Sequence, residues 1–170
     1  MALSVDGTAN SGVTDTASIS TTLTTTLTND IIVVVLSYAG GSALTASISD
    51  TAGLTWNTRY PVTATAAEGT PGTLYIAEYW AYSPNVLSSD VITVALSATV
   101  YANLCAFGVN GANTTAPFDT NTSLPSLASS KTSNAFSTNS SSDLILCLMG
   151  SNSSITSPTG ITNINSGLDY

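Results

Sequence analysis

An unbroken apolar run is the strongest pattern in the chain. Six β-branched or aliphatic residues occupy positions 31–36, directly after the polar pair Asn29-Asp30. Such residues fit a pleated surface, and a short apolar run between polar residues is typical of a strand buried on both faces. A buried helix is the alternative, but the run ends at Ala39-Gly40-Gly41-Ser42, which indicates a turn. We therefore expect a strand in the middle of the fold.

Two later segments begin in the same way as this run. Ser89-Asp90 precedes an apolar segment at 91–94, and Ser142-Asp143 precedes another at 144–147. Aspartate and asparagine bond nearby backbone groups and tolerate turn conformations, so they mark the points where strands begin. We interpret the three segments as similar strand starts. An internal duplication is the alternative, although the intervening segments match poorly.

Alternation of apolar and polar residues predicts further strands. These lie near 16–27, 44–49, 54–60, 73–82, 90–97, 99–109 and 143–149, with weaker segments at 134–137 and 161–164. Pro61 interrupts the third of them, and no window has a helical period. Eight or nine short strands predict an all-β fold, an antiparallel two-sheet β-sandwich of the jelly-roll type. We expect an N-terminal arm or pairing segment at 1–15 and one sandwich domain over 16–170.

Composition narrows the choice of partners. Charged residues make up 7% of the chain and the net charge is −8, with only Arg59 and Lys131 basic. Two cations cannot release many counterions, so nucleic-acid binding and attraction to an anionic membrane are excluded. No apolar stretch is long enough for membrane insertion. Solubility must come from Ser, Thr and Asn, whose side chains cost little entropy to order. Such a surface suits association with copies of the same chain, or exposure to extracellular proteases.

The first residues and the cysteines bear on the cellular setting. The start Met1-Ala2-Leu3-Ser4 lacks the basic region and apolar core of a secretory signal. Either this is a mature form, or the protein is made in the cytoplasm and leaves in a particle.

Cys105 and Cys147 both lie in apolar runs. We interpret them as two buried hydrophobic residues, and a disulfide between adjacent strands is the alternative. Without histidine, a Cys-His nucleophile or zinc site is ruled out.

Acidic residues are the remaining candidates for chemistry. Glu78 shares a predicted strand face with apolar residues, so burial could raise its pKa. We favour a glutamate at the sheet rim, bonded to Arg59 or a tyrosine. A glycosidase needs two facing carboxylates. Other acidic residues fall in predicted turns or a loop, namely Asp50, Glu68, Asp90 and Asp119. We predict no enzyme, no catalytic residue, no metal site and no cofactor; the dense Asp/Asn/Gly spacing of a calcium loop is absent.

Aromatic residues are the only candidates for ligand or interface contacts. They are Trp56, Tyr75, Tyr79, Trp80 and Tyr82. Exposed on a flat sheet, these rings could bind a sugar, but aromatic strands are more often part of the core. Alternation places Trp80 and Tyr82 on one face of the strand at 73–82, and Tyr75 and Tyr79 on the other.

Several motifs occur in an order and spacing shared with a known group of domains. They include Val5-Asp6-Gly7-Thr8-Ala9, Asn29-Asp30-Ile31-Ile32-Val33-Val34, Asp50-Thr51-Ala52-Gly53-Leu54-Thr55-Trp56, Glu78-Tyr79-Trp80-Ala81 and Pro117-Phe118-Asp119. Over residues 5–125 the chain resembles a β-sandwich domain that recurs in phage and prophage structural proteins and in secreted archaeal and bacterial surface proteins. The shared residues belong to turns and core, so the resemblance implies a fold and a setting but no chemistry.

Three functional hypotheses follow. The first is a non-enzymatic virion protein, a capsid decoration, cement or head-tail surface subunit, which forms a homo-oligomer such as a trimer and binds a capsid or tail protein. The second is a subunit of an extracellular filament or surface layer, whose N-terminal segment completes the sheet of a neighbour. The third is a glycan-binding adhesin module at the cell surface. We rank them in this order.

Overall fold

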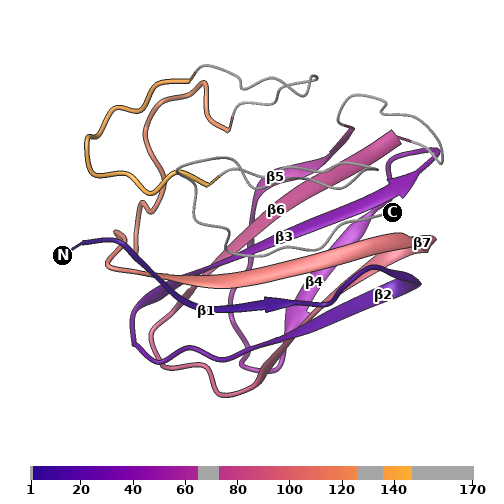
Figure 1. Ribbon diagram of the computed structural model, residues 1–170, viewed down its shortest axis with the longest axis horizontal. Helices are drawn as coiled ribbons and strands as arrows, with labels where there is room; N and C mark the ends of the chain where they lie inside the picture. The colour runs from indigo at the N-terminus through magenta and orange to yellow at the C-terminus, as the bar shows by residue number, and fades with distance from the viewer. Residues whose placement is uncertain (1, 65–72, 126–135, 147–170) are drawn as a thin grey trace.

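The fold is all-β throughout the part of the chain that the structure describes. This computed structural model describes residues 2–64, 73–125 and 136–146, which contain no helix and hence no helix able to cross a membrane (Figure 1). The strands are β1 (Ser4–Asn10), β2 (Thr14–Leu23), β3 (Asp30–Gly40), β4 (Ala46–Asp50), β5 (Asn57–Ala64), β6 (Thr73–Ser83) and β7 (Asp90–Asn110). All seven join one antiparallel sheet, in the order β1-β7-β3-β6-β5, with β2 and β4 also paired to β7.

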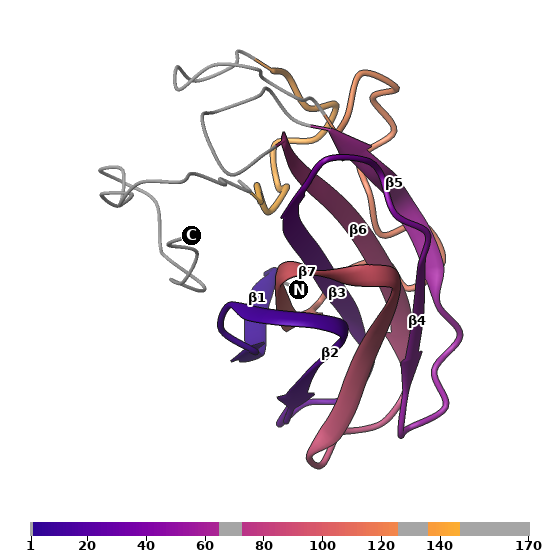
Figure 2. The ribbon, with the colours of Figure 1, turned by 90° about the vertical axis from the view of Figure 1, so that its right-hand side faces the viewer.

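The long strand β7 holds the sheet together. Its residues 90–96 pair with β2 and β4, and residues 100–102 pair with the first residues of β2. Residues 101–109 pair with β3 and residues 105–110 pair with β1. The sequence predicted two strands here with a break after Ser97-Ala98, and that prediction is wrong. Neither glycine nor proline occurs between Asp90 and Phe107, so the backbone stays extended past Ser97-Ala98 and the change of direction is taken up as a register shift opposite β2. Figure 2 shows the two parts of β7 running in different directions.

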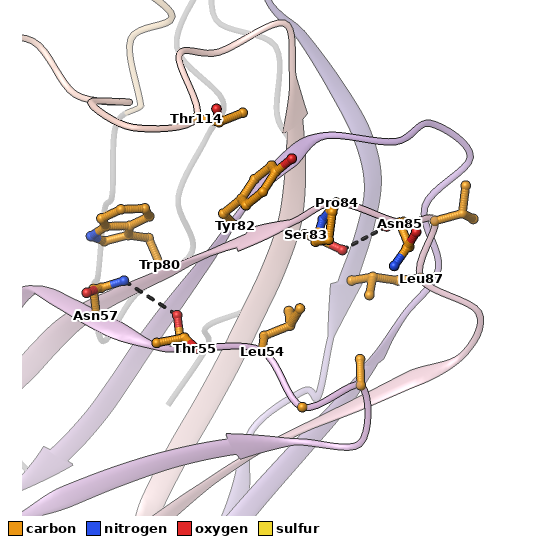
Figure 3. A pocket seen from close by; sticks show the side chains of 13 residues that line it. Leu54, Thr55, Asn57, Trp80, Tyr82, Ser83, Pro84, Asn85, Leu87 and Thr114 are labelled. Carbon is orange, nitrogen blue, oxygen red and sulfur yellow. Dashed lines mark hydrogen bonds between the residues drawn. The ribbon is translucent and has the colours of Figure 1, made fainter.

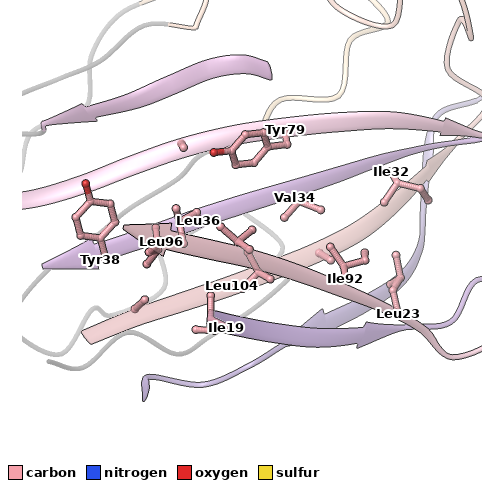
Figure 4. Close-up of a cluster of buried hydrophobic side chains, with 14 of the residues drawn as sticks. Ile19, Leu23, Ile32, Val34, Leu36, Tyr38, Tyr79, Ile92, Leu96 and Leu104 are labelled. Carbon is pink, nitrogen blue, oxygen red and sulfur yellow. The ribbon is translucent and has the colours of Figure 1, made fainter. Parts of the chain in front are cut away.

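The larger core cluster draws residues from both parts of β7. Ile92 and Val94 come from the first part and Leu104 from the second, and they meet Ile19 of β2 and Leu36 of β3 (Figure 4). Over residues 18–23, β2 alternates between exposed and buried residues, so Ser18, Ser20 and Thr22 face outward while Ile19, Thr21 and Leu23 face inward.

The predicted central strand is confirmed. Every residue of β3 from Asp30 to Tyr38 is buried, and β3 lies between β7 and β6. Its second face forms another cluster through Ile31, Val33 and Val35, against which Leu144 and other partly buried residues pack. A strand with two buried faces explains why the apolar run does not alternate.

Other predicted strands differ in number and extent. The described chain has seven strands in one hydrogen-bonded sheet, where eight or nine in two sheets were expected. Residues 136–137 and 143–146 are not in strands, and the remainder of the predicted segments 134–137 and 143–149, with all of 161–164, lies outside the described residues. The edge strand β5 contains Pro61 beside a register shift, as expected for a proline that cannot donate to a ladder.

Two of the three predicted strand starts are confirmed. Asn29 and Ser89 adopt left-handed conformations, with φ of 64° and 54°, directly before β3 and β7 begin. Asp30 and Asp90 then turn inward and are buried. Asp90 Oδ1 accepts hydrogen bonds from the backbone N–H groups of Thr51 and Ala52 and from the Thr51 hydroxyl. The strand start therefore anchors the turn after β4.

Candidate functional site

The five candidate aromatic residues lie on two different faces. Tyr75 and Tyr79 of β6 are buried in the larger core, and Trp56 packs against that core from the segment before β5. Trp80 and Tyr82 of β6 project from the opposite face and pack against the smaller cluster. The faces predicted for β6 are thus confirmed, but the five rings do not form one sugar-binding platform, because alternate residues of a strand point to opposite sides.

Trp80 and Tyr82 instead line an open cleft of about 460 Å³ (Figure 3). Its walls come from the turn after β4, the start of β5, the outer face of β6 and the loop that follows β6. The remaining lining residues are Ala52, Gly53, Leu54, Thr55, Asn57, Ser83, Pro84, Asn85, Val86, Leu87 and Thr114. None of the lining residues is charged, so the cleft suits a neutral ligand.

Contacts at the rim hold the two rings in fixed positions. The Tyr82 hydroxyl donates to Asn29 Oδ1 at 2.6 Å. The Trp80 ring meets Phe118 edge to face, with centroids 5.5 Å apart. The Arg59 guanidinium in turn lies 3.6 Å from the centre of the Phe118 ring. Fixed aromatic rings beside amide and hydroxyl groups offer both apolar and hydrogen-bonding contacts to a ligand.

Glu78 is paired with Arg59, one of the two partners predicted, but the predicted position at the sheet rim is wrong, because Glu78 is buried in β6 between β3 and β5. Arg59 Nη1 lies 3.5 Å from Glu78 Oε1, and both side chains are mostly buried, with exposed fractions of 19% and 7%. Burial raises the pKa of Glu78, and the Arg59 charge and hydrogen bond oppose that rise. The pair joins β5 to β6, so its geometry supports a structural role.

The predicted turn aspartates bind backbone groups where they are described. Asp50 accepts the N–H of Leu54, and Asp119 accepts the N–H groups of Asn121 and Asn139. Glu68 lies outside the described residues. Within the described ranges, no group of three His, Cys, Asp or Glu residues could hold a metal ion.

The cysteines can be described only in part. Cys105 carries a free thiol, and burial raises its pKa to about 11, so the reactive thiolate is scarce at neutral pH. Cys147 lies outside the described residues.

An uncharged face lies on the outer side of β2, β4 and the first part of β7. Its residues form aligned rows across the strands, namely Ser18–Ala95–Ser47, Ser20–Thr93–Ser49 and Thr22–Val91. All are exposed except Thr93, which is half-buried, and Ser20 Oγ and Thr93 Oγ1 share a hydrogen bond of 2.8 Å. Sequence reasoning found the Ser/Thr alternation of β2 but could not find this face, because alternation does not identify the neighbouring strands.

Comparison with known proteins adds no assignment to this geometry. No protein-family model matches the chain, and neither a curated protein nor a solved structure is similar to it. A functional proposal therefore depends on the residues of the chain itself.

Proposed function

We propose that the protein is a non-enzymatic structural subunit of a virus particle, a capsid decoration, cement or head-tail surface protein that associates with copies of itself. The uncharged face of β2, β4 and β7 carries this proposal, and the resemblance to phage structural domains supplies the setting. In this proposal the two parts of the sheet act as the layers of a jelly-roll-like sandwich. The shared core of β2, β3 and both parts of β7 supports that arrangement.

Charge supports a second copy of this chain as the occupant of the face. With a net charge of −8, two copies repel one another unless their carboxylates stay apart. The eight side chains of the three rows carry no charge, and Val91 is the largest of them. Serine, threonine and alanine lose little rotamer entropy on burial, so little binding free energy is needed to offset the ordering of these side chains in a contact between copies.

The setting is tested on particles. Virus particles from the source culture are separated on a density gradient, and the fractions are digested with a non-tryptic protease for peptide mass spectrometry. We expect the chain to co-migrate with the major capsid protein at a fixed copy ratio, on the virion surface. Recovery only in sheared appendages or in the medium would overturn the virion proposal and favour a filament or adhesin.

The face is tested with matched charge variants of the purified chain. Ala95→Arg places a long cation on β7 at the centre of the row Ser18–Ala95–Ser47, whereas Ser42→Arg makes the same charge change in an exposed loop after β3. Analytical ultracentrifugation should show weaker self-association for Ala95→Arg and wild-type association for Ser42→Arg. Equal behaviour of the two variants would remove the face from the proposal.

The cleft favours a second function, binding of a neutral glycan. Trp80 and Tyr82 provide fixed rings for the apolar face of a sugar, and Asn57 and Asn85 provide amide groups beside them. The probes are neutral oligosaccharides of glucose, mannose, galactose and N-acetylglucosamine, titrated while the NMR signal of the Trp80 indole is followed. We expect one class to shift this signal, and Asn57→Ala to weaken its binding. If no probe shifts the indole at millimolar concentration, the glycan function is rejected.

A further inference from the structure

The side chain of Asp6 ties β1 to the loop that follows β2. Only 6% of Asp6 is exposed. Its carboxylate accepts hydrogen bonds from the backbone N–H and the hydroxyl of Thr26, and from the backbone N–H of Leu27, at 2.7 to 3.1 Å. These donors compensate a buried negative charge, so the surroundings favour an ionised Asp6.

A second carboxyl group lies beside it. Asp30, the first residue of β3, is fully buried, and Asn110 Nδ2 donates to its Oδ1 at 2.8 Å. Among the described residues, Asp30 Oδ2 has no donor. Gly108 leaves room for this approach, because a Cβ at that position would lie 2.5 Å from the Asp6 carbonyl oxygen and 3.5 Å from Asp30 Oδ2.

Asp6 and Asp30 each act on the pKa of the other, and Asp30 Oδ2 is buried without a donor, so a proton shared between the two carboxyl groups would satisfy that oxygen. Burial raises the pKa of Asp30; the Asn110 hydrogen bond opposes this and the neighbouring Asp6 raises it further. Burial acts in the same direction on Asp6, but the hydrogen bonds from Thr26 and Leu27 outweigh it and lower the pKa. Asp30 is therefore the group that holds the proton.

Among the described residues, the charges around the pair come from the pair itself. β1 contributes Asp6 and β3 contributes Asp30, whereas the groups from β7 and from the loop after β2 do not ionise. Those groups are Gly108 and Asn110 of β7, and Thr25, Thr26 and Leu27 of the loop. No described cation is among the groups that act on Asp30, so no counterion offsets a second negative charge.

We propose that Asp6 and Asp30 share one proton and form an acid-favoured clasp, which holds β1 on β7 of its own chain and loosens when that proton leaves. Two buried carboxylates in contact repel one another strongly. β1 is the element that can move away, because among the described strands it lies at the end of the sheet order and pairs only with β7. Its departure exposes the edge of β7 at residues 105–110, which can then pair with β1 of a second copy.

The test is amide hydrogen exchange of the full chain between about pH 4 and pH 8, corrected for intrinsic exchange rates. Above the pKa of Asp30, each pH unit lowers the protonated fraction about tenfold. We therefore expect protection of β1 and of β7 residues 105–110 to fall by up to about tenfold per unit in that range, while β3 and β6 keep theirs. Constant protection of β1 over the whole range would overturn the clasp.

Variants separate the clasp from general charge effects. Asp30→Asn keeps a donor for Asp6 without a titrating group, so protection of β1 should become independent of pH. Asp15→Asn makes the same charge change at an exposed position of β2 and should behave as wild type. If Asp30→Asn keeps the wild-type pH dependence, the proposal is wrong.

Carboxyl ¹³C NMR of the wild-type chain gives a second readout that needs no variant. We expect one aspartate to titrate above its usual range and another below it, with the two transitions coupled. Independent titration of both groups near the ordinary value of about 3.9 would reject the shared proton even if the variants fail to fold.

Discussion

At the residue scale, Arg59 compensates a buried negative charge. Of the two basic residues in the chain, it is the one that lies in the described part. It contacts Glu78 on one side and the ring of Phe118 on the other. Sequence reasoning named Arg59 or a tyrosine as the partner of Glu78, and the structure shows Arg59, but nothing along the chain places Phe118 beside β5.

Arg59→Ala should destabilise the protein by about 1–3 kcal/mol at pH 7, because it leaves Glu78 buried and unpaired. The pKa of Glu78 is raised in the folded state, so protonation of this side chain favours the folded protein. That stabilisation is fully present below the unfolded pKa of 4.5 and is lost as pH rises through the folded pKa. Removing Arg59 raises the folded pKa of Glu78 further. The destabilisation caused by Arg59→Ala should therefore be smaller at pH 4 than at pH 7. Urea unfolding at both pH values measures this.

The control is the double variant Arg59→Ala/Glu78→Gln, which has no buried charge to compensate. It should recover part of the stability lost in Arg59→Ala at pH 7. A double variant less stable than Arg59→Ala would contradict a charge-pair role for Glu78.

Gly108→Ala should destabilise the fold by about 1–3 kcal/mol through overpacking. The added Cβ would approach the Asp6 carbonyl oxygen to 2.5 Å, and a backbone atom cannot move aside as a flexible side chain can. Gly41→Ala is the matched control, because a Cβ there has no neighbour within 4 Å. Thermal unfolding of both variants decides the matter, and equal stability of the two would contradict the close approach of β1 and β7.

At the element scale, alternation predicted which side each residue of β6 faces, and the apolar run predicted a buried β3. Alternation could not predict that segments 90–97 and 99–109 form one strand, because small polar residues such as Ser97 and Thr99 occur in turns and strands alike. Nor could it pair β2 with β4 across β7, since neighbours depend on contacts far apart in the chain. The uncharged face and the cleft, both built from several elements, were therefore beyond sequence reasoning.

The turn between β4 and β5 supports one wall of the cleft and depends on Asp50. This carboxylate accepts the Leu54 N–H at 3.1 Å and the Trp56 Nε1–H at 2.6 Å. Asp50→Ala should cost about 1.5–3 kcal/mol, the range for hydrogen bonds to a charged group. In a Trp80→Phe background, the emission of Trp56 should move to longer wavelength as the indole gains access to water.

Asp50→Asn is the control for that experiment, because its amide oxygen still accepts one of the two bonds. It should lose less stability than Asp50→Ala and leave the emission nearer to wild type. An unchanged spectrum in Asp50→Ala would show that the turn is held by other contacts, such as those of Thr51 with Asp90.

At the scale of the whole molecule, the net charge opposes the association that we propose for the uncharged face. The chain carries a net charge of −8, and the rows on β2, β4 and β7 hold no charged side chain. Salt screens the long-range repulsion between copies but leaves uncharged contacts intact, since the Debye length falls from about 30 Å at 0.01 M to about 10 Å at 0.1 M. Self-association should therefore strengthen as sodium chloride rises over this range, as measured by sedimentation velocity.

Ion pairs between copies would give the opposite trend, so association that weakens with salt would reject the uncharged face as the contact. Ala95→Arg should remain weakly associated at the higher salt concentration, because screening does not relieve a long side chain placed in that contact.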